Sequence, residues 1–272
     1  MPTVEPARLL ILGGTAEAAA LARAARQRFG AALKVTSSLA GRTRRPTRPP
    51  GRVRVGGFGG AAGLERYLCE AALDMVVDAT HPFAAAISAN ARAACEAVAV
   101  PRLMLIRPMW RRAPDDRWVE VDDAAAAAAA LRRLEPRGGE RRVMLTLGLG
   151  GLEAFADMAD CWFLVRLIEP PRRPLPLARF RVVVGRGPFT VEGERALMAG
   201  QRIGVVLGKA SGGAATEAKI VAARELGLPV IMLRRPAPEP GEKAASVAAA
   251  LDWIARRLDG AAAPAGTRVA AP

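Results

Sequence analysis

The chain has 272 residues, 51% of them hydrophobic, which is enough for one large domain or two domains of ordinary size with buried cores. Three cysteines without metal-ligand spacing argue against a disulfide framework and against a zinc site. The formal net charge is +14, and only four of the 40 basic residues are lysines, so arginines suited to carboxylate or phosphate groups dominate it.

The amino-terminal stretch MPTVEPARLLILGG has a glutamate and a proline where a secretory signal carries positive charge. The alanine run at residues 124–130 is too short to cross a bilayer, which takes about 20 apolar residues. We therefore expect a cytoplasmic protein without a membrane segment, whose cysteines are reduced and mostly buried.

The first half of the chain alternates short apolar runs with helical patterns. The run at residues 8–12 ends at two glycines and is followed by a helical pattern and a second apolar run at 33–37, which predicts a β-α-β unit. Further strands are expected at 53–55, 75–79 and 103–106, with helices at 61–73 and 83–98. Continuous apolar strands between helices predict a parallel sheet covered on both faces.

A cluster of proline, arginine and aspartate near residue 113 interrupts this rhythm and predicts a domain boundary. The second half predicts strands at 143–146, 162–167, 182–184, 203–207 and 230–233, with helices at 122–134, after 150, after 191, at 214–226 and at 243–258. We therefore predict an α/β fold with two Rossmann-like domains, at residues 1–112 and 113–260, and mainly parallel sheets. The composition of residues 261–272 predicts a disordered tail.

The stretch LILGGTAEA predicts an anion-binding turn between the first strand and the first helix. Gly13 and Gly14 allow the backbone to approach a phosphate, and the helix amino terminus supplies free N–H groups. Thr15 offers a hydroxyl donor, and Glu17 completes the pattern G-G-T-x-E. This pattern differs from G-x-G-x-x-G, so a tight turn without a ligand remains an alternative.

The end of the second strand indicates which dinucleotide would bind. No acidic residue occurs between Glu17 and Glu65, whereas a fold that binds NAD normally presents one there for the ribose hydroxyls. The hydroxyl and basic groups of TSSLAGRT therefore predict NADP rather than NAD, with a solvated basic loop as the alternative. The expected contacts come from Ser37, Ser38, Gly41, Arg42 and Thr43.

The second half carries small and basic residues directly after its strands. In VVLGKASGGAATEAK a glycine-rich turn leads into a helix, which is typical of an anion site, and the spacing differs from that of an ATP-binding loop. For each arginine the alternative is a solvated surface charge. The residues expected to contact an anionic substrate are Thr146, Gly148, Arg166, Arg186, Lys209, Ser211, Gly212, Gly213 and Lys219.

Six stretches are, in their order and spacing, similar to one enzyme family: ILGGTAEA, SLAGRT, DATHPFA, VPRLMLIRP, GRGPF and KASGGAATEAKIVAARELGLPVIMLRRP. They extend from about residue 8 to residue 236. The chain thereby resembles the precorrin-6A reductases of cobalamin biosynthesis, a family that includes cobalt-precorrin-6A reductases. Ala214 and Ala215 stand where relatives often have a further glycine, which leaves the detailed shape of that loop open.

The resemblance implies a reductase that uses NADPH to reduce one carbon–carbon double bond in the macrocycle of precorrin-6A, giving precorrin-6B. It implies that Gly13, Gly14, Thr15 and the segment 37–43 bind the cofactor. Residues 1–112 are then the NADP-binding domain and 113–260 the substrate-binding domain, with the substrate in a cleft between them. The implied partner is a tetrapyrrole with many carboxylates, with possible hand-over to other enzymes of the pathway. Metal-free and cobalt-containing substrates both remain open, and no metal site is expected in the protein.

His81, the single histidine, lies in DATHPFA, just after the fourth predicted strand and hence where a nicotinamide would extend. Imidazole ionises near neutral pH, and Pro82 keeps His81 out of helical geometry, so acid catalysis is possible. A cationic macrocycle needs no strong acid, however, and water or a substrate carboxyl could donate the proton. We therefore place Asp78, Thr80 and His81 near the reaction. For His81 we favour positioning of the cofactor or substrate, with loop packing as the third alternative, and we expect Thr80, His81 and Pro82 to contact the cofactor.

Two other functions fit the sequence less well. An NADP-sensing regulator that binds nucleic acid would need a helix-turn-helix, an RNA-binding sheet signature or exposed aromatic residues, and the sequence has none of these motifs. A reductase of another polyanionic substrate is compatible with the glycine turns taken alone. The family resemblance favours the precorrin substrate, and we expect neither nucleic acid nor membrane as a partner.

Overall fold

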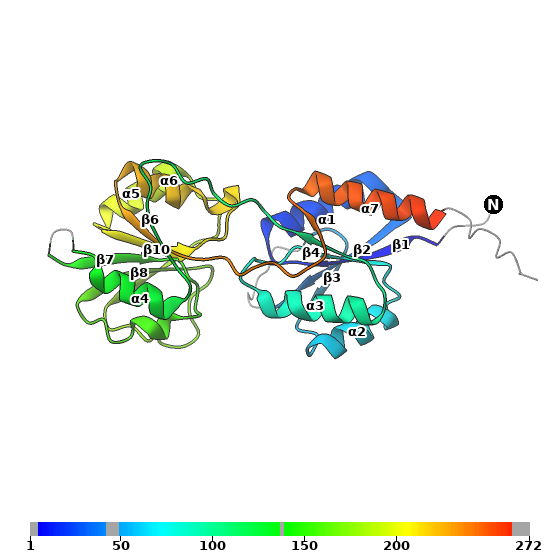
Figure 1. Cartoon of the computed structure of the whole chain (residues 1–272), viewed down its shortest axis with the longest axis horizontal. Helices are drawn as coiled ribbons and strands as arrows, with labels where there is room; N and C mark the ends of the chain where they lie inside the picture. Colours follow the sequence, from blue (N-terminus) through cyan, green and yellow to red (C-terminus); the bar gives the residue numbers. More distant parts are fainter. Residues whose placement is uncertain (1–4, 42–48, 137–138, 263–272) are drawn as a thin grey trace, which may run out of the picture. The chain divides into compact units, whose positions relative to one another are not determined.

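The computed structural model describes residues 5–41, 49–136 and 139–262 (Figure 1). The chain forms two compact units, one comprising Met1–Arg107 with Ala237–Pro272 and the other Pro108–Pro236. Each unit is built on its own six-stranded sheet, and every strand pairing in both sheets is parallel. The predicted α/β fold is confirmed.

The first unit has the strand order β12-β5-β4-β1-β2-β3. Its strands are β1 (Ala7–Leu12), β2 (Leu33–Leu39), β3 (Arg52–Val55), β4 (Met75–Asp78), β5 (Arg102–Leu105) and β12 (Glu242–Ala244). Helices α1 (Ala16–Phe29) and α7 (Val247–Ala262) cover one face, and α2 (Ala61–Glu70) and α3 (Ala85–Ala97) cover the other (Figure 1). The 3-10 helix η1 (Gly30–Ala32) follows α1.

The central strand β1 shows why this sheet is covered on both faces. Leu9 and Ile11 are buried against residues of α1 and α7, whereas Leu10 and Leu12 are buried against residues of α2 and α3. Side chains alternate between the faces of a strand, so a continuous apolar run requires helices on both sides.

The second unit has the order β6-β11-β10-β7-β8-β9. Its strands are β6 (Arg117–Val121), β7 (Arg141–Leu145), β8 (Cys161–Leu167), β9 (Phe180–Val184), β10 (Val205–Lys209) and β11 (Pro229–Leu233). Helices α5 (Val191–Gly200) and α6 (Ala218–Glu225) cover one face, and α4 (Ala124–Arg133) lies on the other with the 3-10 helix η2 (Leu152–Phe155) (Figure 1). A further 3-10 helix, η3 (Ala214–Thr216), precedes α6.

The structure divides the chain differently from the expected boundary at residues 112 and 113. Strand β12 pairs with β5, and Trp253 and Ile254 of α7 are buried in the core beside Leu9 and Ile11, so the last helix belongs to the first unit and not to the second. Strands β6 and β12 were not predicted, and the helix expected after Gly150 is only the short η2. Of the tail expected at 261–272, residues 261 and 262 end α7 and the others lie outside the described residues.

The three cysteines are free, and Cys95 and Cys161 are buried while Cys69 is exposed. Burial raises the pKa of the Cys95 and Cys161 thiols to about 11. Both therefore remain protonated and unreactive near neutral pH. Within the described part of the chain, no helix combines the length and the apolar character that crossing a bilayer requires.

Candidate active site

Each sheet has one point at which the strand order reverses. In the first unit β1 lies between β2 and β4, and in the second β7 lies between β8 and β10. From β1 the chain continues toward one side of the sheet and from β4 toward the other, and β7 and β10 behave in the same way. The loops after these strands therefore part and leave room for a ligand. Most of the predicted site residues lie on the loops at these two points.

In the first unit, backbone hydrogen bonds join the ends of three strands. The Gly13 N–H donates to the Ser38 carbonyl at 2.9 Å, and the Ala79 N–H donates to the Leu12 carbonyl at 2.9 Å. The Thr15 hydroxyl donates to the Ala79 carbonyl at 2.7 Å and accepts from the Ala18 N–H at 3.1 Å. Thr15 therefore caps α1 and ties two loops together, and its hydroxyl proton is not the free ligand donor that the sequence suggested.

The turn between β1 and α1 has the backbone of an anion site. Gly14 has φ +107°, and a Cβ placed on it would meet no atom within 4 Å, so the space over this turn is open. Helix α1 runs for 14 residues from this turn, and its first N–H groups and its dipole favour negative charge. The predicted phosphate role of Gly13 and Gly14 is therefore compatible with the local geometry.

The end of β2 carries a buried hydroxyl without a partner. Ser37 is 2% exposed, and its Oγ has no hydrogen-bond partner among the described residues. Ser38 is also buried. Gly41 lies just after β2 and packs close to Val55, since a Cβ placed on Gly41 would lie 3.3 Å from Val55 Cγ1. The predicted contacts Arg42 and Thr43 lie outside the described residues.

Glu17 pairs with a residue that the sequence did not single out. Its carboxylate lies 3.2 Å from the guanidinium of Arg107, whose side chain is 11% exposed. Glu17 stands in the first turn of α1, and Arg107 comes just after β5. The pair therefore brings a cation to the carboxyl edge of the sheet, and the predicted ligand contact of Glu17 stays a prediction.

Asp78 shapes the loop that follows β4. Its Oδ1 accepts from the Thr80 N–H at 3.1 Å and from the Thr80 hydroxyl at 2.7 Å, and Thr80 lies 3.4 Å from the Ser88 hydroxyl. Asp78 is 3% exposed, and its Oδ2 has no hydrogen-bond partner in the described part of the chain. Asp78 begins the motif DATHPFA, and the sequence places it near the reaction without giving it a binding role.

The backbone of the next residues orients the imidazole of His81. The Phe83 N–H donates to His81 Nδ1 at 3.2 Å, and the His81 carbonyl accepts from the Ala84 N–H at 2.7 Å. A neutral imidazole whose Nδ1 accepts carries its proton on Nε2. His81 thus has the geometry of a hydrogen-bond donor through Nε2, with Pro82 forming the turn between His81 and Phe83.

In the second unit a lysine joins the two loops at the reversal point. Lys209 Nζ donates to the Leu147 carbonyl at 2.7 Å, and the Thr146 N–H and hydroxyl donate to the Leu207 carbonyl at 2.9 and 3.1 Å. A Cβ on Gly208 would lie 2.7 Å from the Thr146 hydroxyl, so this close approach requires glycine. Gly148 lies on the same loop, with φ +75° and no atom within 4 Å of a Cβ position.

The loop after β10 brings the other small and basic residues together. Ser211 and Gly212 are buried, Gly213 follows them, and Lys219 is 7% exposed at the start of α6. Lys219 Nζ donates to the Thr216 carbonyl at 3.0 Å. The predicted set Lys209, Ser211, Gly212, Gly213 and Lys219 therefore forms one cluster at the carboxyl edge of the second sheet.

The two predicted arginines differ from one another. Arg166 forms a 2.7 Å ion pair with Glu194, whose side chain is 2% exposed, and its guanidinium stacks on Phe189 at 4.2 Å. These contacts give Arg166 a structural role within the unit, and its predicted contact with the substrate stays a prediction. Arg186 is exposed, and its neighbour Gly187 packs against the Ala215 carbonyl, so Arg186 lies beside the cluster.

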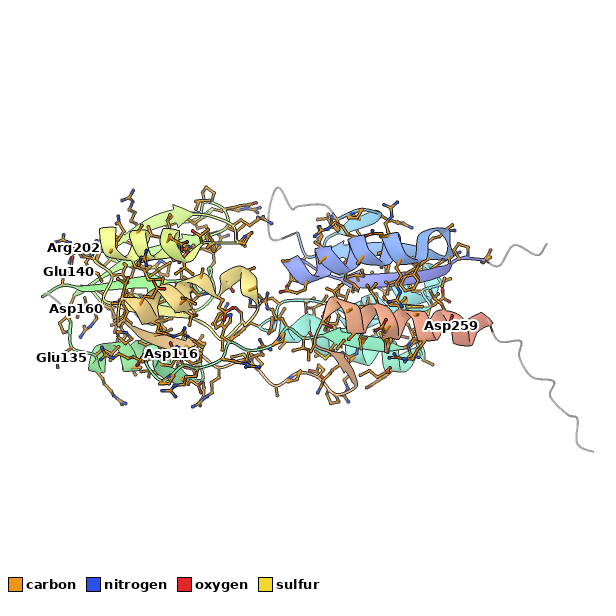
Figure 2. All side chains as sticks on the ribbon, turned by 90° about the horizontal axis from the view of Figure 1, so that it is seen from above. Asp116, Glu135, Glu140, Asp160, Arg202 and Asp259 are labelled. Atoms are coloured by element: carbon orange, nitrogen blue, oxygen red, sulfur yellow. The ribbon has the colours of Figure 1, made fainter. Side chains whose placement is uncertain are left out.

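The opposite edge of the second sheet has a different character. Arg141 pairs with Asp160, and Glu140 pairs with both Arg142 and Arg179. Figure 2 shows Glu140 and Asp160 at the same end of this unit. Because these cations are matched by carboxylates, this edge is a poorer site for an anionic ligand than the carboxyl edge.

The chain is similar to known proteins over nearly its whole length. The sequence model of the family described as precorrin-6x reductase CbiJ/CobK matches residues 8–255. A precorrin-6A reductase from Rhodococcus erythropolis is 46% identical over 248 residues, which cover 91% of this chain and 97% of that protein. A precorrin-6A reductase from Rhodobacter capsulatus is 45% identical over 249 residues, covering 91% of this chain and 96% of that protein.

Among solved structures, one described as CobK precorrin-6A reductase matches with a TM-score of 0.85 and 43% identity. The match covers 92% of this chain and 97% of that one. The sequence resemblance is thereby confirmed over both units. This chain belongs to the precorrin-6x reductase CbiJ/CobK family.

Proposed function

We propose that this protein is an NADPH-dependent precorrin-6A reductase of cobalamin biosynthesis. The reaction adds a hydride and a proton to the two carbons of one double bond of the macrocycle and gives precorrin-6B. Membership of the reductase family supports the reaction class. The observation that supports different ligands for the two units is that the loop after β1 leads into the 14-residue helix α1, whereas the loop after β7 leads into the four-residue η2.

The first unit suits a dinucleotide. The open turn at Gly14 and the amino terminus of α1 would hold the pyrophosphate. The unpartnered Ser37 hydroxyl lies at the end of β2, where the ribose of a bound dinucleotide is recognised in this fold. The end of β2 has no carboxylate at residues 39–41, which are Leu39, Ala40 and Gly41. A 2′-phosphate would therefore meet no like charge there, and this favours NADPH over NADH.

The second unit suits a substrate with many carboxylates. Lys209 and Lys219 lie close to glycine-rich backbone at one sheet edge, with Arg186 beside them. Ammonium groups and backbone N–H groups in such loops bind carboxylates without the phosphate geometry of an ATP site. We assign Thr146, Gly148, Ser211, Gly212 and Gly213 to the shape of this site.

His81 would act by position. Bound NADPH supplies the hydride, and the protein controls where the reacting groups lie. Because Nδ1 accepts from the Phe83 N–H, a neutral His81 would donate from Nε2 to a carbonyl or carboxylate, while Asp78 and Thr80 hold its loop. Direct proton donation by His81 to the macrocycle is the alternative role for this residue.

The proposal is tested by incubating the purified protein without oxygen with precorrin-6A and either NADPH or NADH. We expect the macrocycle absorbance to change and NADPH to be consumed in equal amount, with a much lower rate for NADH. Cobalt-precorrin-6A in a parallel reaction distinguishes the cobalt-containing substrate from the metal-free one.

Absence of NADPH-dependent reduction of either macrocycle would sink the proposal. Equal rates with NADPH and NADH would leave the reductase assignment in place and contradict the cofactor preference. Faster turnover of cobalt-precorrin-6A would reassign the substrate within the same family.

A further inference from the structure

The loop formed by Ala210–Thr216, here the 210–216 loop, is held by side chains that lie outside it. Arg235 donates to the Ala210 carbonyl from Nε at 3.2 Å and to the Ser211 carbonyl from Nη2 at 2.7 Å. Trp110 Nε1 donates to the Gly213 carbonyl at 2.9 Å. Together with the bond from Lys219 to Thr216, these contacts occupy four carbonyl oxygens of the loop.

The direction of these contacts matters for an anionic ligand. A carbonyl oxygen that faced the ligand would repel a carboxylate, because the oxygen carries partial negative charge. Here Arg235, Trp110 and Lys219 direct four such oxygens toward donors of the protein. Because these four carbonyl oxygens bind protein donors, they do not face the ligand, and the electrostatic environment of the loop favours an anion.

Trp110 makes a second contact that involves charge. Lys219 Nζ lies 4.9 Å from the centre of the Trp110 ring, within the range of a cation–π interaction. Both side chains are buried, Trp110 at 6% and Lys219 at 7% exposure. The indole therefore holds the loop backbone through its N–H and sets the place of the ammonium through its ring.

The backbone beside Trp110 packs directly on the loop. The Gly213 N–H donates to the Pro108 carbonyl at 3.2 Å. A Cβ on Gly212 would lie 2.2 Å from that carbonyl oxygen and 2.6 Å from Arg235 Nη2, so no other residue fits without displacing the clamp. Pro108 to Trp110 thus form a wall of the loop, although the sequence suggested only an interdomain boundary here.

We propose that Trp110 and Arg235 are positioning residues for substrate binding: they hold the 210–216 loop and Lys219 in the arrangement that receives a carboxylate of the macrocycle. This inference rests on the proposed function, because it takes the second unit as the substrate site. It adds two residues from outside the glycine-rich motif to the determinants of substrate affinity.

The test compares Trp110→Phe with Trp162→Phe. Phenylalanine at 110 keeps a ring beside Lys219 and removes the N–H bond to Gly213, whereas Trp162 stacks on Arg142 at 3.8 Å near the opposite edge of the same sheet. Loss of one such bond, worth about 1 kcal/mol, corresponds to about a fivefold rise in the KM for precorrin-6A. The KM for NADPH should not change, and Trp162→Phe should leave both KM values unchanged.

A second measurement separates this inference from the reductase proposal. Binding of uroporphyrin, a tetrapyrrole that carries carboxylates, is followed without turnover by the anisotropy of its own fluorescence. We expect weaker binding by Trp110→Phe and by Arg235→Leu than by the wild type and by Trp162→Phe, with similar melting temperatures for the two phenylalanine variants.

Equal uroporphyrin affinity in Trp110→Phe and the wild type would overturn the positioning role. So would absence of uroporphyrin binding by the wild type, or a KM for NADPH that rises as much as that for precorrin-6A. If the wild type binds uroporphyrin but does not reduce precorrin-6A, the reductase proposal fails and the comparison of variants still decides the role of Trp110.

Discussion

The two units share the order of five of their six sheet strands and differ in the groups that they place at the point of reversal. In each, the strand that precedes the first glycine loop lies at the centre, and the strand order reverses beside it. In the first unit a neutral hydroxyl, that of Thr15, ties the two loops; in the second a lysine, Lys209, does so. Under the proposed function, the first unit would present a helix amino terminus to a phosphate, and the second unit would present an ammonium group to a carboxylate.

The units also complete their sheets differently. The sixth position, beside β5 or β11, is filled in the first unit by β12 from the end of the chain and in the second by β6 from the beginning of that unit. In the first unit, apolar packing of Trp253 stabilises the sheet edge formed by β12. In the second unit, the ion pair of Asp116 with Arg224 stabilises the sheet edge formed by β6. Equivalent positions in the topology are therefore stabilised by different physical interactions.

The largest expected effect follows from the apolar edge. Trp253 is 2% exposed, so Trp253→Ala should lower the free energy of unfolding by about 4 kcal/mol through lost burial and a cavity. Hydrogen exchange should locate this loss in β1, β4 and β5 of the first unit. Trp118→Ala, on β6, is the matched variant and should instead increase exchange in the second unit. Faster exchange confined to the second unit in Trp253→Ala would contradict the placement of α7.

The fold was largely predictable because apolar runs in parallel sheets are continuous. The strands at β1, β4 and β10 are such runs, and periodicity located them. Strand β6, with the sequence RWVEV, carries charges because it lies at a sheet edge, and β12 has only three residues. The placement of α7 depends on contacts between distant parts of the sequence, such as that of Arg28 with Asp252, 224 residues apart, which no local pattern encodes.

The positions proposed for ligand contacts could be located from the sequence where they lie on the backbone of strand ends and turns. Gly14, Gly148 and Lys209 lie at or just beyond the ends of strands, and both the strands and these end residues can be recognised in the sequence. Hydrogen-bond partners could not be predicted, so neither the capping role of Thr15 nor the pairing of Arg166 with Glu194 was foreseen. Trp110 lies 103 residues from its partner Gly213, and only the tertiary structure brings them together.

The second expected effect follows from the ionic edge. Arg224 binds Asp116 through two hydrogen bonds of 2.9 and 3.0 Å, and the Asp116 side chain is 2% exposed. Asp116→Asn leaves the arginine without its charge partner and should cost about 3 kcal/mol of unfolding free energy near neutral pH. Asp157→Asn, in the exposed pair with Arg132, is the matched control and should cost less than about 1 kcal/mol.

This second effect should depend on pH. Burial by itself would raise the pKa of Asp116, but hydrogen bonds from Arg224 and from the Ala113 N–H outweigh it and lower that pKa below its ordinary value. The contribution is therefore complete above the pKa in the unfolded chain, about 4, and is lost as the pH falls through the native value. Denaturant unfolding of wild type and Asp116→Asn at several pH values measures this. A difference that stayed constant down to the acid limit would show that shape and not charge holds this edge.

The smallest expected effect is the one that bears most directly on the two ligand sites. Gly14 has φ +107° and Gly148 has φ +75°, and in both cases a methyl group would meet no atom within 4 Å. Alanine at either position therefore acts through backbone strain of about 1–2 kcal/mol, without a steric clash.

Gly14→Ala should weaken NADPH binding about tenfold, measured by the fluorescence of the bound nicotinamide, and leave the KM for precorrin-6A unchanged. Gly148→Ala should raise the KM for precorrin-6A and leave NADPH binding unchanged. The effect should be smaller, because φ +75° lies nearer the left-handed well at about +57° that alanine can occupy. If both variants weakened the same ligand, the two reversal points would serve one site, and the assignment of phosphate to the first unit and carboxylate to the second would have to be abandoned.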